Sequence, residues 1–409
     1  MRILHTADWH LGKHLEGFSR MDEQESFLED FIEIVQREEV DMVIIAGDIY
    51  DTSNPPARAE KMFYDTLKKI SAHGERLILV IAGNHDNPER LIAAGPLARD
   101  HGIIMLGTPK TVAQTGSYGE HKVIASSEGM IEVEINGEKV VILTIAYPSE
   151  KRLNEVLYKE LTTDEEKLAT YAERIQALFT ELENYFREDT INVVVSHLFA
   201  MGSEEEGSER NIQLGGSYII DGRYFPQKAQ YIALGHIHKP QIVPGTQKRA
   251  RYAGSPIHYN KKERHFQKKC FIVDLEPGQE ALIHEVPLKV YKPIEVWQCD
   301  SIEEAIALCE ENSTKECWTY LEIKTQRFIR ENEIKTMKNY KKDIIEIMPI
   351  LLCDEKPRNE ITNMADKSFE DIFREFYKNE RETEPDEELV NMLLELVKED
   401  MYEAAEAEG

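Results

Sequence analysis

Acid, amide and imidazole side chains occur at five separated points of the sequence, each at the end of a strand-like run. The groups at these points are Asp8, His10, Asp48, Asn84, His85, His197, His236 and His238. One such motif alone is weak, because a single buried histidine is more often a hydrogen-bonded core residue than a ligand. Their shared position is more informative, because sites in α/β sheets assemble where the strands end. We therefore expect these groups to converge.

Carboxylate and amide oxygens combined with imidazole, without thiolate, suit Mn²⁺, iron or Zn²⁺. The groups are too many for one ion and suit two ions that share one carboxylate. Two ions about 3.5–4 Å apart can hold both the attacking and the leaving oxygen of a phosphate ester. The alternative, in which these groups only close loops, is disfavoured because buried polar groups are costly without a compensating cation.

The first hundred residues alternate between predicted strands and amphipathic helices, which is typical of α/β proteins. The predicted strands before the first three motifs are residues 2–6, 41–46 and 76–82. A capping box, Asp22-x-x-Glu25, predicts the start of one helix, and residues 57–73 have the spacing of another. This order predicts a sheet with helices packed on its faces.

The pattern then changes to alternating strands, and Asn136-Gly137 predicts a hairpin turn between two of them. Helices are expected within residues 149–187, and residues 199–216 are expected to form a loop. Buried strands at 191–195 and 231–234 lead into the last histidine motifs. The metal-binding domain is therefore expected to span residues 1–287.

Beyond this domain the sequence predicts a small α+β capping domain at 288–353, a polar linker at 354–366 and two amphipathic helices within 367–409. The apolar residues of these helices that we expect to bind a partner are Phe369, Ile372, Phe373, Phe376, Tyr377, Leu389 and Leu393. Aromatic side chains are enriched in interface cores. The alternative is that both helices fold back on the core of the chain.

Charge is distributed unevenly along the chain. The net charge of −27 disfavours a nucleic-acid partner. However, residues 351–409 carry 19 acids against 7 bases, whereas residues 239–269 carry nine Lys or Arg against one acid, Glu263. The candidate contacts to a DNA backbone in this basic segment are Lys248, Arg249, Arg251, Lys261 and Lys262. The alternative is a solvated face without a ligand.

Five cysteines include no Cys-x-x-Cys pair, which favours reduced structural thiols and argues against a zinc finger. No apolar run approaches the roughly 20 residues of a membrane helix. No secretory signal pattern precedes the first predicted strand. These features predict a cytoplasmic protein without a membrane partner, and binding to DNA would associate it with the nucleoid.

Five motifs resemble, in order, those of the calcineurin-like metallophosphoesterase superfamily. They are Asp8-Trp9-His10, Gly47-Asp48-Ile49-Tyr50-Asp51, Gly83-Asn84-His85-Asp86, Ser196-His197 and Gly235-His236-Ile237-His238. Within the superfamily, the sequences of residues 5–12 and 83–86 are similar to those of the SbcD family of bacterial DNA-repair nucleases. The resemblance extends into the terminal helices and is weakest across 288–353. It implies an α/β fold in which a two-sheet sandwich is flanked by helices.

The resemblance also implies residue roles. One ion would be bound by Asp8, His10 and His238. The other would be bound by Asn84, His197 and His236, with Asp48 bridging the two. His85 would act as general acid rather than as a ligand.

Two aspartates are less certain in role. Asp86 either orients His85 or caps a loop. Asp51 stands where some archaeal relatives carry a histidine, so a second imidazole contact to the phosphate is in doubt.

The function implied is a Mn²⁺-dependent exonuclease on double-stranded DNA ends, with endonuclease activity on hairpins and single strands. No Walker motif occurs, so ATP hydrolysis would come from a partner, the SMC-like ATPase SbcC, bound through the terminal helices. A homodimer within a heterotetramer is implied as well. The alternatives are a phosphatase or small-molecule phosphodiesterase, and a binding scaffold with an inactive site.

Overall fold

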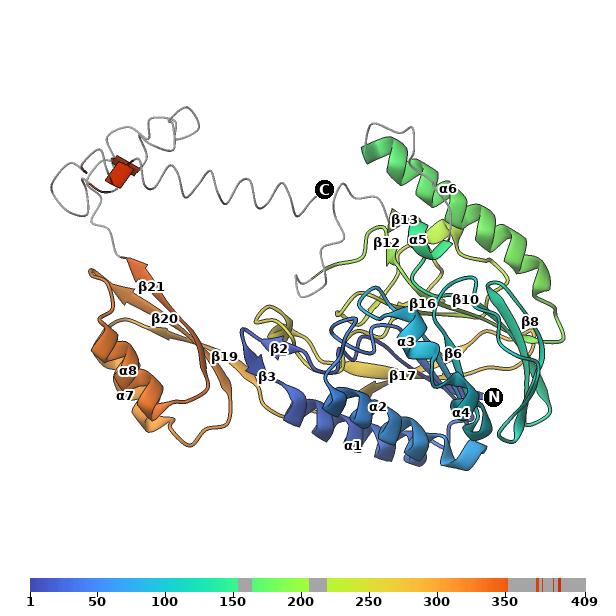
Figure 1. Cartoon of the computed structure of the whole chain (residues 1–409), viewed down its shortest axis with the longest axis horizontal. Helices are drawn as coiled ribbons and strands as arrows, with labels where there is room; N and C mark the ends of the chain where they lie inside the picture. The colour runs from blue at the N-terminus through green and yellow to red at the C-terminus, as the bar shows by residue number, and fades with distance from the viewer. Residues whose placement is uncertain are drawn as a thin grey trace. The chain divides into compact units, whose positions relative to one another are not determined.

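A computed structural model of the chain describes residues 1–153, 164–205 and 219–351 (Figure 1). Six isolated residues of the C-terminal region are also described, namely Phe373, Arg374, Tyr377, Pro385, Leu389 and Val390. The chain divides into two compact units, residues 1–350 and residues 351–409. All of the metal-ligand candidates lie in the first unit.

The first sheet contains the strands that precede the first three motifs, in the order β18-β17-β1-β4-β5-β6. Its strands are β1 (Arg2–Thr6), β4 (Met42–Ala46), β5 (Leu77–Ile81), β6 (Ile103–Leu106), β17 (Lys269–Asp274) and β18 (Leu282–Pro287). β1, β4, β5 and β6 are parallel, and β17 runs antiparallel to β1. The carboxyl ends of the four parallel strands therefore lie along one edge of the sheet.

The second sheet contains the strands that lead into the last two motifs, in the order β15-β16-β14-β11-β10-β9-β8-β7. Its strands are β7 (Gly116–Tyr118), β8 (His121–Ser127), β9 (Met130–Ile135), β10 (Glu138–Ile145), β11 (Ile191–His197), β14 (Tyr231–Gly235), β15 (Gln241–Ile242) and β16 (Ala250–Tyr252). β10, β11, β14 and β16 are parallel. The predicted hairpin joins β9 to β10, with Asn136 and Gly137 at φ 52° and 84°, as a tight turn of this kind requires.

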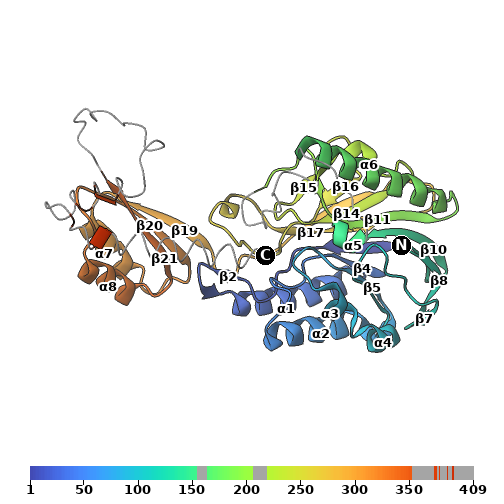
Figure 2. The ribbon, with the colours of Figure 1, turned by 45° about the horizontal axis from the view of Figure 1, so that its top comes forward.

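The two sheets pack face to face and form the sandwich that the resemblance implies (Figure 2). Alternate residues of the inner strands, such as Ile44, Leu79 and Val193, form the core between the sheets. The helices beside the first sheet are α1 (Met21–Arg37), α2 (Ala57–Ile70), α3 (Pro88–Ile92) and α4 (Gly95–Ala98). Those beside the second are α5 (Glu150–Leu153) and α6 (Asp164–Leu182). Strands covered on both faces are apolar throughout, as β4 and β5 are.

Helix α1 buries the apolar residues that recur along one face, among them Phe27 and Phe31. Their rings lie edge-on to the Trp9 ring, with centroids 5.8 and 5.4 Å away. The helix does not begin at the predicted capping box. It begins at Met21, and the carboxylates of Asp22 and Glu25 bind Arg58 of α2 instead, because they face that neighbouring helix.

Several short elements complete the first unit. The short strands are β2 (His14–Leu15), β3 (Phe18–Ser19), β12 (Phe199–Ala200) and β13 (Ile219–Ile220). The 3-10 turns are η1 (Ala72–Gly74), η2 (Arg99–His101), η3 (Glu183–Tyr185), η4 (Gly222–Tyr224) and η5 (Glu263–His265). The predicted loop at 199–216 thus begins with a strand, β12, that pairs with β13. Residues 206–218 lie outside the described part.

Residues 294–351 form the small α+β arrangement that the sequence predicts. Its elements are β19 (Ile294–Cys299), α7 (Ile302–Glu311), β20 (Trp318–Thr325), α8 (Glu331–Tyr340) and β21 (Ile344–Leu351). The strand order is β19-β20-β21, and both helices pack on this sheet over a core that includes Cys299 and Cys309. Trp318 joins this arrangement to α1, because its indole N–H donates to the Glu23 carboxylate at 2.7 Å.

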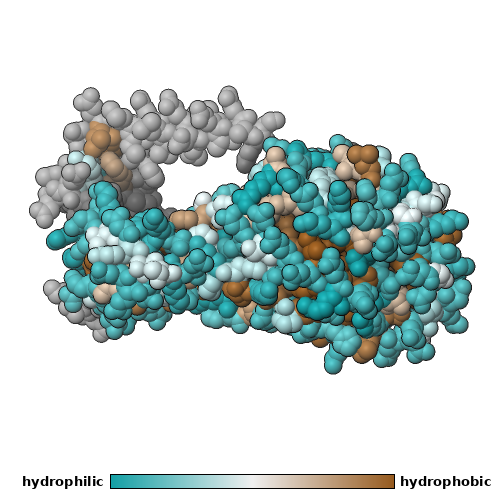
Figure 3. Space-filling view, turned by 90° about the horizontal axis from the view of Figure 1, so that it is seen from below, coloured by the Kyte–Doolittle hydropathy of each residue, from teal (hydrophilic) through white to brown (hydrophobic). Residues whose placement is uncertain are grey.

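Hydrophilic residues cover most of the face seen in Figure 3, in keeping with the 31% of charged residues. The large exposed apolar side chains, such as Leu97 and Phe328, are distributed over different elements. Isolated exposed apolar residues are normal on protein surfaces. No helix among the described residues has both the length and the apolar character that crossing a membrane requires.

The contact between α1 and Trp9 supports the loop that carries Asp8 and His10. We expect Phe31→Ala to lower the free energy of unfolding by about 3–5 kcal/mol, because it removes a fully buried ring. Urea denaturation followed by tryptophan fluorescence measures the change. Glu29→Ala, on the exposed face of the same helix, is the control and should stay within about 0.5 kcal/mol of the parent.

Candidate metal centre

The motifs lie at neighbouring strand ends of both sheets. Asp8 and Asp48 follow the adjacent parallel strands β1 and β4, and Asn84 follows β5. His197 ends β11, and His236 follows the adjacent β14. The two edges meet directly, because His197 Nδ1 donates to the carbonyl of Ala46 at the end of β4, at 2.9 Å. The sandwich therefore brings groups from both sheets to one place.

The backbone turns sharply after β1, β4 and β14. Asp8, His10, Asp48 and His236 all have positive φ, at 52°, 43°, 49° and 106°. Such conformations cost non-glycine residues about 1–3 kcal/mol each and persist only where the surroundings enforce them. Here the Asp8 and His10 amides donate to the carbonyls of Gly47 and Asp48, both at 3.0 Å. These backbone conformations direct the side chains toward one another beyond the ends of the strands.

Glycines next to the motifs allow the strand ends to approach closely. A Cβ atom on Gly83 would lie 2.1 Å from Asp48 Oδ1, and one on Gly235 would lie 1.9 Å from the Ala46 carbonyl. Neither position has room for any larger residue. The Gly-Asn-His-Asp and Gly-His-Ile-His segments therefore need their glycines for a steric reason.

Asp8, His10 and His238 form the first group of ligand atoms, all within 4.8 Å of one another. The Nε2 atoms of His10 and His238 are 2.9 Å apart. Asp8 Oδ1 accepts the His236 backbone N–H at 2.9 Å, while its Oδ2 is buried without a hydrogen-bond partner among the described residues. A buried carboxylate oxygen left unpaired beside two facing imidazoles fits a cation between them.

Asp48 lies between His10 of this first group and His197. Its Oδ1 accepts the His85 backbone N–H at 2.9 Å. Its Oδ2 lies 3.5 Å from His10 Nε2 and 3.4 Å from His197 Nε2. One oxygen is thus anchored to the backbone while the other faces imidazoles of both sheets.

Asn84, His197 and His236 converge on the other side of Asp48. The Asn84 Oδ1 atom is 2.9 Å from His197 Nε2 and 3.1 Å from His236 Nδ1. Asp8, Asp48 and His197 also form a potential ligand group. All seven sequence-predicted ligand candidates therefore lie in one continuous cluster, and their mixture of oxygen and nitrogen donors suits divalent transition ions.

Burial sets the electrostatics of the cluster. Burial raises the pKa of Asp8 to about 7, although His197 and His238 oppose the rise. Burial also lowers the pKa of His236 to about 3. Burial opposes a charge on His197 too, but the adjacent Asp48 carboxylate raises the pKa of that histidine to about 9. Ionised carboxylates in this interior require positive charge, which divalent cations would supply.

His85 lies beside this cluster. Its ring is edge-on to that of His10, with centroids 4.6 Å apart. Its Nδ1 donates to the carbonyl of Asp51 at 2.6 Å, which leaves Nε2 without the proton in the neutral ring. Burial lowers the pKa of His85.

Asp86 does not orient His85. Its carboxylate accepts the backbone N–H groups of Ile49, Tyr50 and Gly83, so it caps the loops that follow β4 and β5. The loop-capping alternative describes Asp86, and the Asp51 carbonyl orients His85 in its place.

The family model of the calcineurin-like phosphoesterases matches residues 1–240. A second model, described as the Type 5 capsule protein repressor C-terminal domain, matches residues 290–381. The SbcD subunit of the nuclease SbcCD from Bacillus subtilis is 40% identical over 97% of both chains. Its namesake from Rhodobacter capsulatus is 31% identical over 70% of this chain and 69% of its own.

The chain belongs to the SbcD family of calcineurin-like phosphoesterases. Both the resemblance and the predicted fold class are thereby confirmed. The SbcD-family protein is a metal-dependent phosphodiesterase of the nuclease class.

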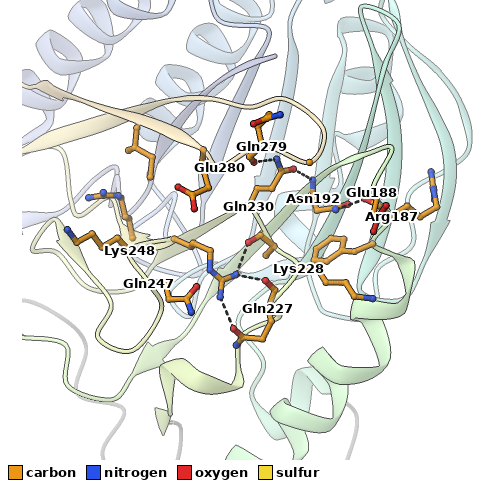
Figure 4. Close-up of a pocket in the computed structure, with 17 residues that line it drawn as sticks. Arg187, Glu188, Asn192, Gln227, Lys228, Gln230, Gln247, Lys248, Gln279 and Glu280 are labelled. Carbon is orange, nitrogen blue, oxygen red and sulfur yellow. Dashed lines mark hydrogen bonds between the residues drawn. The ribbon is translucent and has the colours of Figure 1, made fainter.

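The candidate DNA contacts of this SbcD-family chain lie in two places. Lys248, Arg249 and Arg251 line a pocket of about 750 Å³ where β11, β14 and β16 begin (Figure 4). The motif residues follow the other ends of β11 and β14, so these three bases lie at the opposite end of the sheet. Arg249 donates to the carbonyls of Pro226 and Ala229, which gives it a structural role.

Lys261 and Lys262 lie at the other place, in the segment that follows Tyr259. The Lys261 ammonium lies 5.1 Å from the centre of the Tyr320 ring and 3.5 Å from the Glu346 carboxylate, both in the α+β arrangement. The Tyr259 ring in turn lies 5.8 Å from that of His10. Lys261 and Lys262 therefore follow closely in sequence a residue that packs on a ligand candidate.

The predicted partner-binding helices fall mostly outside the described part of the chain. Phe373, Tyr377 and Leu389 are helical, and the rings of Phe373 and Tyr377 lie 5.9 Å apart. Phe369, Ile372, Phe376 and Leu393 lie outside the described residues.

Sequence reasoning missed a buried group behind the metal centre. In the sequence Glu263 stands out only as the single acid of the basic segment, yet its side chain is fully buried, as is that of Lys268. Glu263 Oε1 lies 3.8 Å from His238 Nδ1. The isolated acid is the one signal in the sequence, because a single carboxylate among nine cations indicates a specific ion pair.

Divalent cations should stabilise the folded chain through this cluster. At a free concentration of 100 times Kd, a bound ion adds about 2.7 kcal/mol to stability. We expect chelation by EDTA to lower the melting temperature and Mn²⁺ to restore it, as measured by differential scanning fluorimetry. Asp48→Asn should remove most of this response, whereas an equal response in the variant would contradict a place for Asp48 among the cation ligands.

Proposed function

We propose that this chain is the DNA-cleaving subunit of an SbcCD-type repair complex and hydrolyses phosphodiester bonds with two divalent cations. The observation that carries the proposal is the position of Asp48. Its Oδ2 atom faces His10 on one side and His197 on the other, at 3.5 and 3.4 Å. A carboxylate placed in this way suits two ions that share it.

Ligand roles follow from the two groups. Asp8, His10 and His238 would hold one ion. Asn84, His197 and His236 would hold the other, with Asp48 between them. When bound, the ions would neutralise charge on the phosphate and stabilise the transition state of its hydrolysis. Mn²⁺ is the proposed ion, because oxygen and imidazole donors without thiolate suit it.

His85 is proposed as the general acid. Its Nδ1 is fixed by the Asp51 carbonyl, and its side chain is 10% exposed, so Nε2 is available to a substrate. Burial lowers the pKa of His85, and an approaching phosphate anion opposes that effect by favouring the imidazolium form. A protonated Nε2 can donate to the leaving oxygen as the ester bond breaks.

DNA is the proposed substrate, with exonuclease action on double-stranded ends and endonuclease action on hairpins and single strands. Support comes from the names of the relatives, which are nuclease subunits, and from the match of residues 290–381 to a second family model. A phosphatase or small-molecule phosphodiesterase would use the same ligands but would not need that region. A scaffold with an inactive site is disfavoured by the complete ligand set.

SbcC is the proposed ATPase partner, bound through residues 367–409. The relatives are named as subunits of SbcCD, and the second family model extends to residue 381. We propose residues 1–287 as the nuclease domain, 288–353 as the capping domain and 354–366 as the linker. A homodimer within a heterotetramer, associated with the nucleoid, completes the proposal.

Replacement of His85 separates chemistry from metal binding. We expect His85→Ala to lower the rate of Mn²⁺-dependent DNA cleavage by about 10²–10⁴-fold, because general acid catalysis is lost. The variant should retain two ions per chain in elemental analysis. His284→Ala, an exposed histidine of β18, is the matched control and should cleave normally. A parallel loss of metal in His85→Ala would show that His85 is a ligand.

Two substrates assayed side by side with Mn²⁺ distinguish a nuclease from a small-molecule phosphodiesterase. We expect linear double-stranded DNA to be degraded with the higher kcat/KM, because only a polymer engages groups beyond the cluster. A p-nitrophenyl phosphodiester should be a poor substrate. Rapid hydrolysis of the small ester without DNA cleavage would favour the phosphodiesterase alternative.

Deletion of residues 367–409 tests the partner site. The truncated chain should no longer capture SbcC in a pull-down, yet it should still nick DNA with Mn²⁺, because all of the ligand candidates are retained. Full capture of SbcC by the truncated chain would place the binding site elsewhere.

A further inference from the structure

The two ring nitrogens of His238 face different groups. Nε2 lies 2.9 Å from His10 Nε2 in the ligand cluster. Nδ1 lies 3.8 Å from Glu263 Oε1 on the opposite side of the ring. A carboxylate on the far nitrogen of a metal-binding histidine fixes the tautomer and the ring orientation, and it makes the near nitrogen a better ligand.

Glu263 is itself held by a buried cation. The Lys268 ammonium donates to Glu263 Oε2 at 2.5 Å, to Ser255 Oγ at 2.6 Å and to the His238 carbonyl at 2.9 Å. These three bonds use all three ammonium protons. The ion pair therefore reaches His238 at two points: the Glu263 carboxylate lies within ion-pair distance of its ring, and the Lys268 ammonium donates to its backbone carbonyl.

The segment that carries Glu263 is fixed on the other side as well. Glu263 Oε2 accepts the backbone N–H of Tyr259 at 3.2 Å. The Tyr259 hydroxyl donates to the Trp9 carbonyl at 2.5 Å and accepts from the Gln24 amide at 2.8 Å. Its ring lies 5.8 Å from that of His10 and 6.1 Å from that of His238. Both histidines of the proposed first ion therefore rest on one segment.

A buried ion pair is a poor source of stability, because desolvation offsets much of the attraction between the charges. Its presence between a strand and a ligand histidine is better explained by orientation. We propose that Glu263 and Lys268 are positioning residues that orient His238 for the ion shared with Asp8 and His10. This inference rests on the proposed function and extends it to one of the two ions.

The two sides of the cluster differ in what supports their histidines. His238 faces the Glu263 carboxylate, and His10 Nδ1 lies 3.5 Å from the Asp51 carboxylate. His197, on the other side, donates to the neutral carbonyl of Ala46. Replacement of Glu263 should therefore weaken the binding of the ion at Asp8, His10 and His238 and leave the binding of the other ion unchanged.

The test compares Mn²⁺ binding to the full-length parent and to Glu263→Gln/Lys268→Met, by calorimetric titration and by electron paramagnetic resonance. The double variant removes both charges, so neither is left buried alone. We expect affinity for one ion to fall about 10–100-fold and affinity for the other to stay within about twofold. The spin-coupled signal of a Mn²⁺ pair should give way to that of a single ion.

The matched control is Lys269→Met/Glu285→Gln, which removes the neighbouring but exposed ion pair between β17 and β18. It should bind both ions as the parent does. Circular dichroism and melting of the metal-free chains establish whether the double variant is folded. The single variant Glu263→Asp keeps the charge but shortens the side chain, so its affinity for the first ion should lie between those of the parent and the double variant.

Unchanged affinity for both ions in a folded double variant would overturn the proposal, as would an equal loss of both. Failure of the proposed function gives a different result, in which the parent itself binds no Mn²⁺ pair. If the double variant does not fold, Glu263→Asp decides the question. Weaker binding of one ion alone in that variant supports orientation by Glu263, and affinity equal to that of the parent for both ions overturns it.

Discussion

The candidate metal centre gathers buried carboxylates and imidazoles, and a protein interior stabilises ionised carboxylates only where positive charge compensates them. Asp8 and Asp48 each accept a backbone N–H from another strand end on one carboxylate oxygen, and each also lies beside histidines of the cluster. The same hydrogen bonds that hold the loops in place thus leave one oxygen of each aspartate for a cation. The hydrogen bonds that stabilise the loops therefore also place the candidate ligand atoms.

This constraint explains the local features around the cluster. Positive φ at Asp8, His10 and Asp48 stores strain that a smooth strand exit would avoid. Glycines let the strand ends approach, and carbonyls of Ala46 and Asp51 set the tautomers of His197 and His85. Each feature helps to place a side chain in the same cluster. Such preorganisation is what catalysis at a phosphate requires.

A second polar network joins the cluster to the α+β arrangement. Trp318 donates to Glu23, Glu23 pairs with Arg20, and Arg20 donates to the carbonyl of His258. The next residue, Tyr259, packs on His10 and His238, two of the ligand candidates. The path from Trp318 to His10 is thus continuous and buried, so the α+β arrangement and the proposed first ion share a support.

Local sequence patterns predicted the strands that lead into the motifs, the order of the motifs and the ligand candidates, because period, turn chemistry and residue type are local properties. The strand bounds at 2–6 and the hairpin at Asn136-Gly137 follow from such local rules. Three features became visible only in the packed molecule: Asp86 caps a loop, Lys248 and Arg251 lie at the opposite end of the sheet from the cluster, and Glu263 faces His238. These are contacts between residues far apart in the chain or in different sheets, and no local pattern records which distant side chain a buried charge will meet.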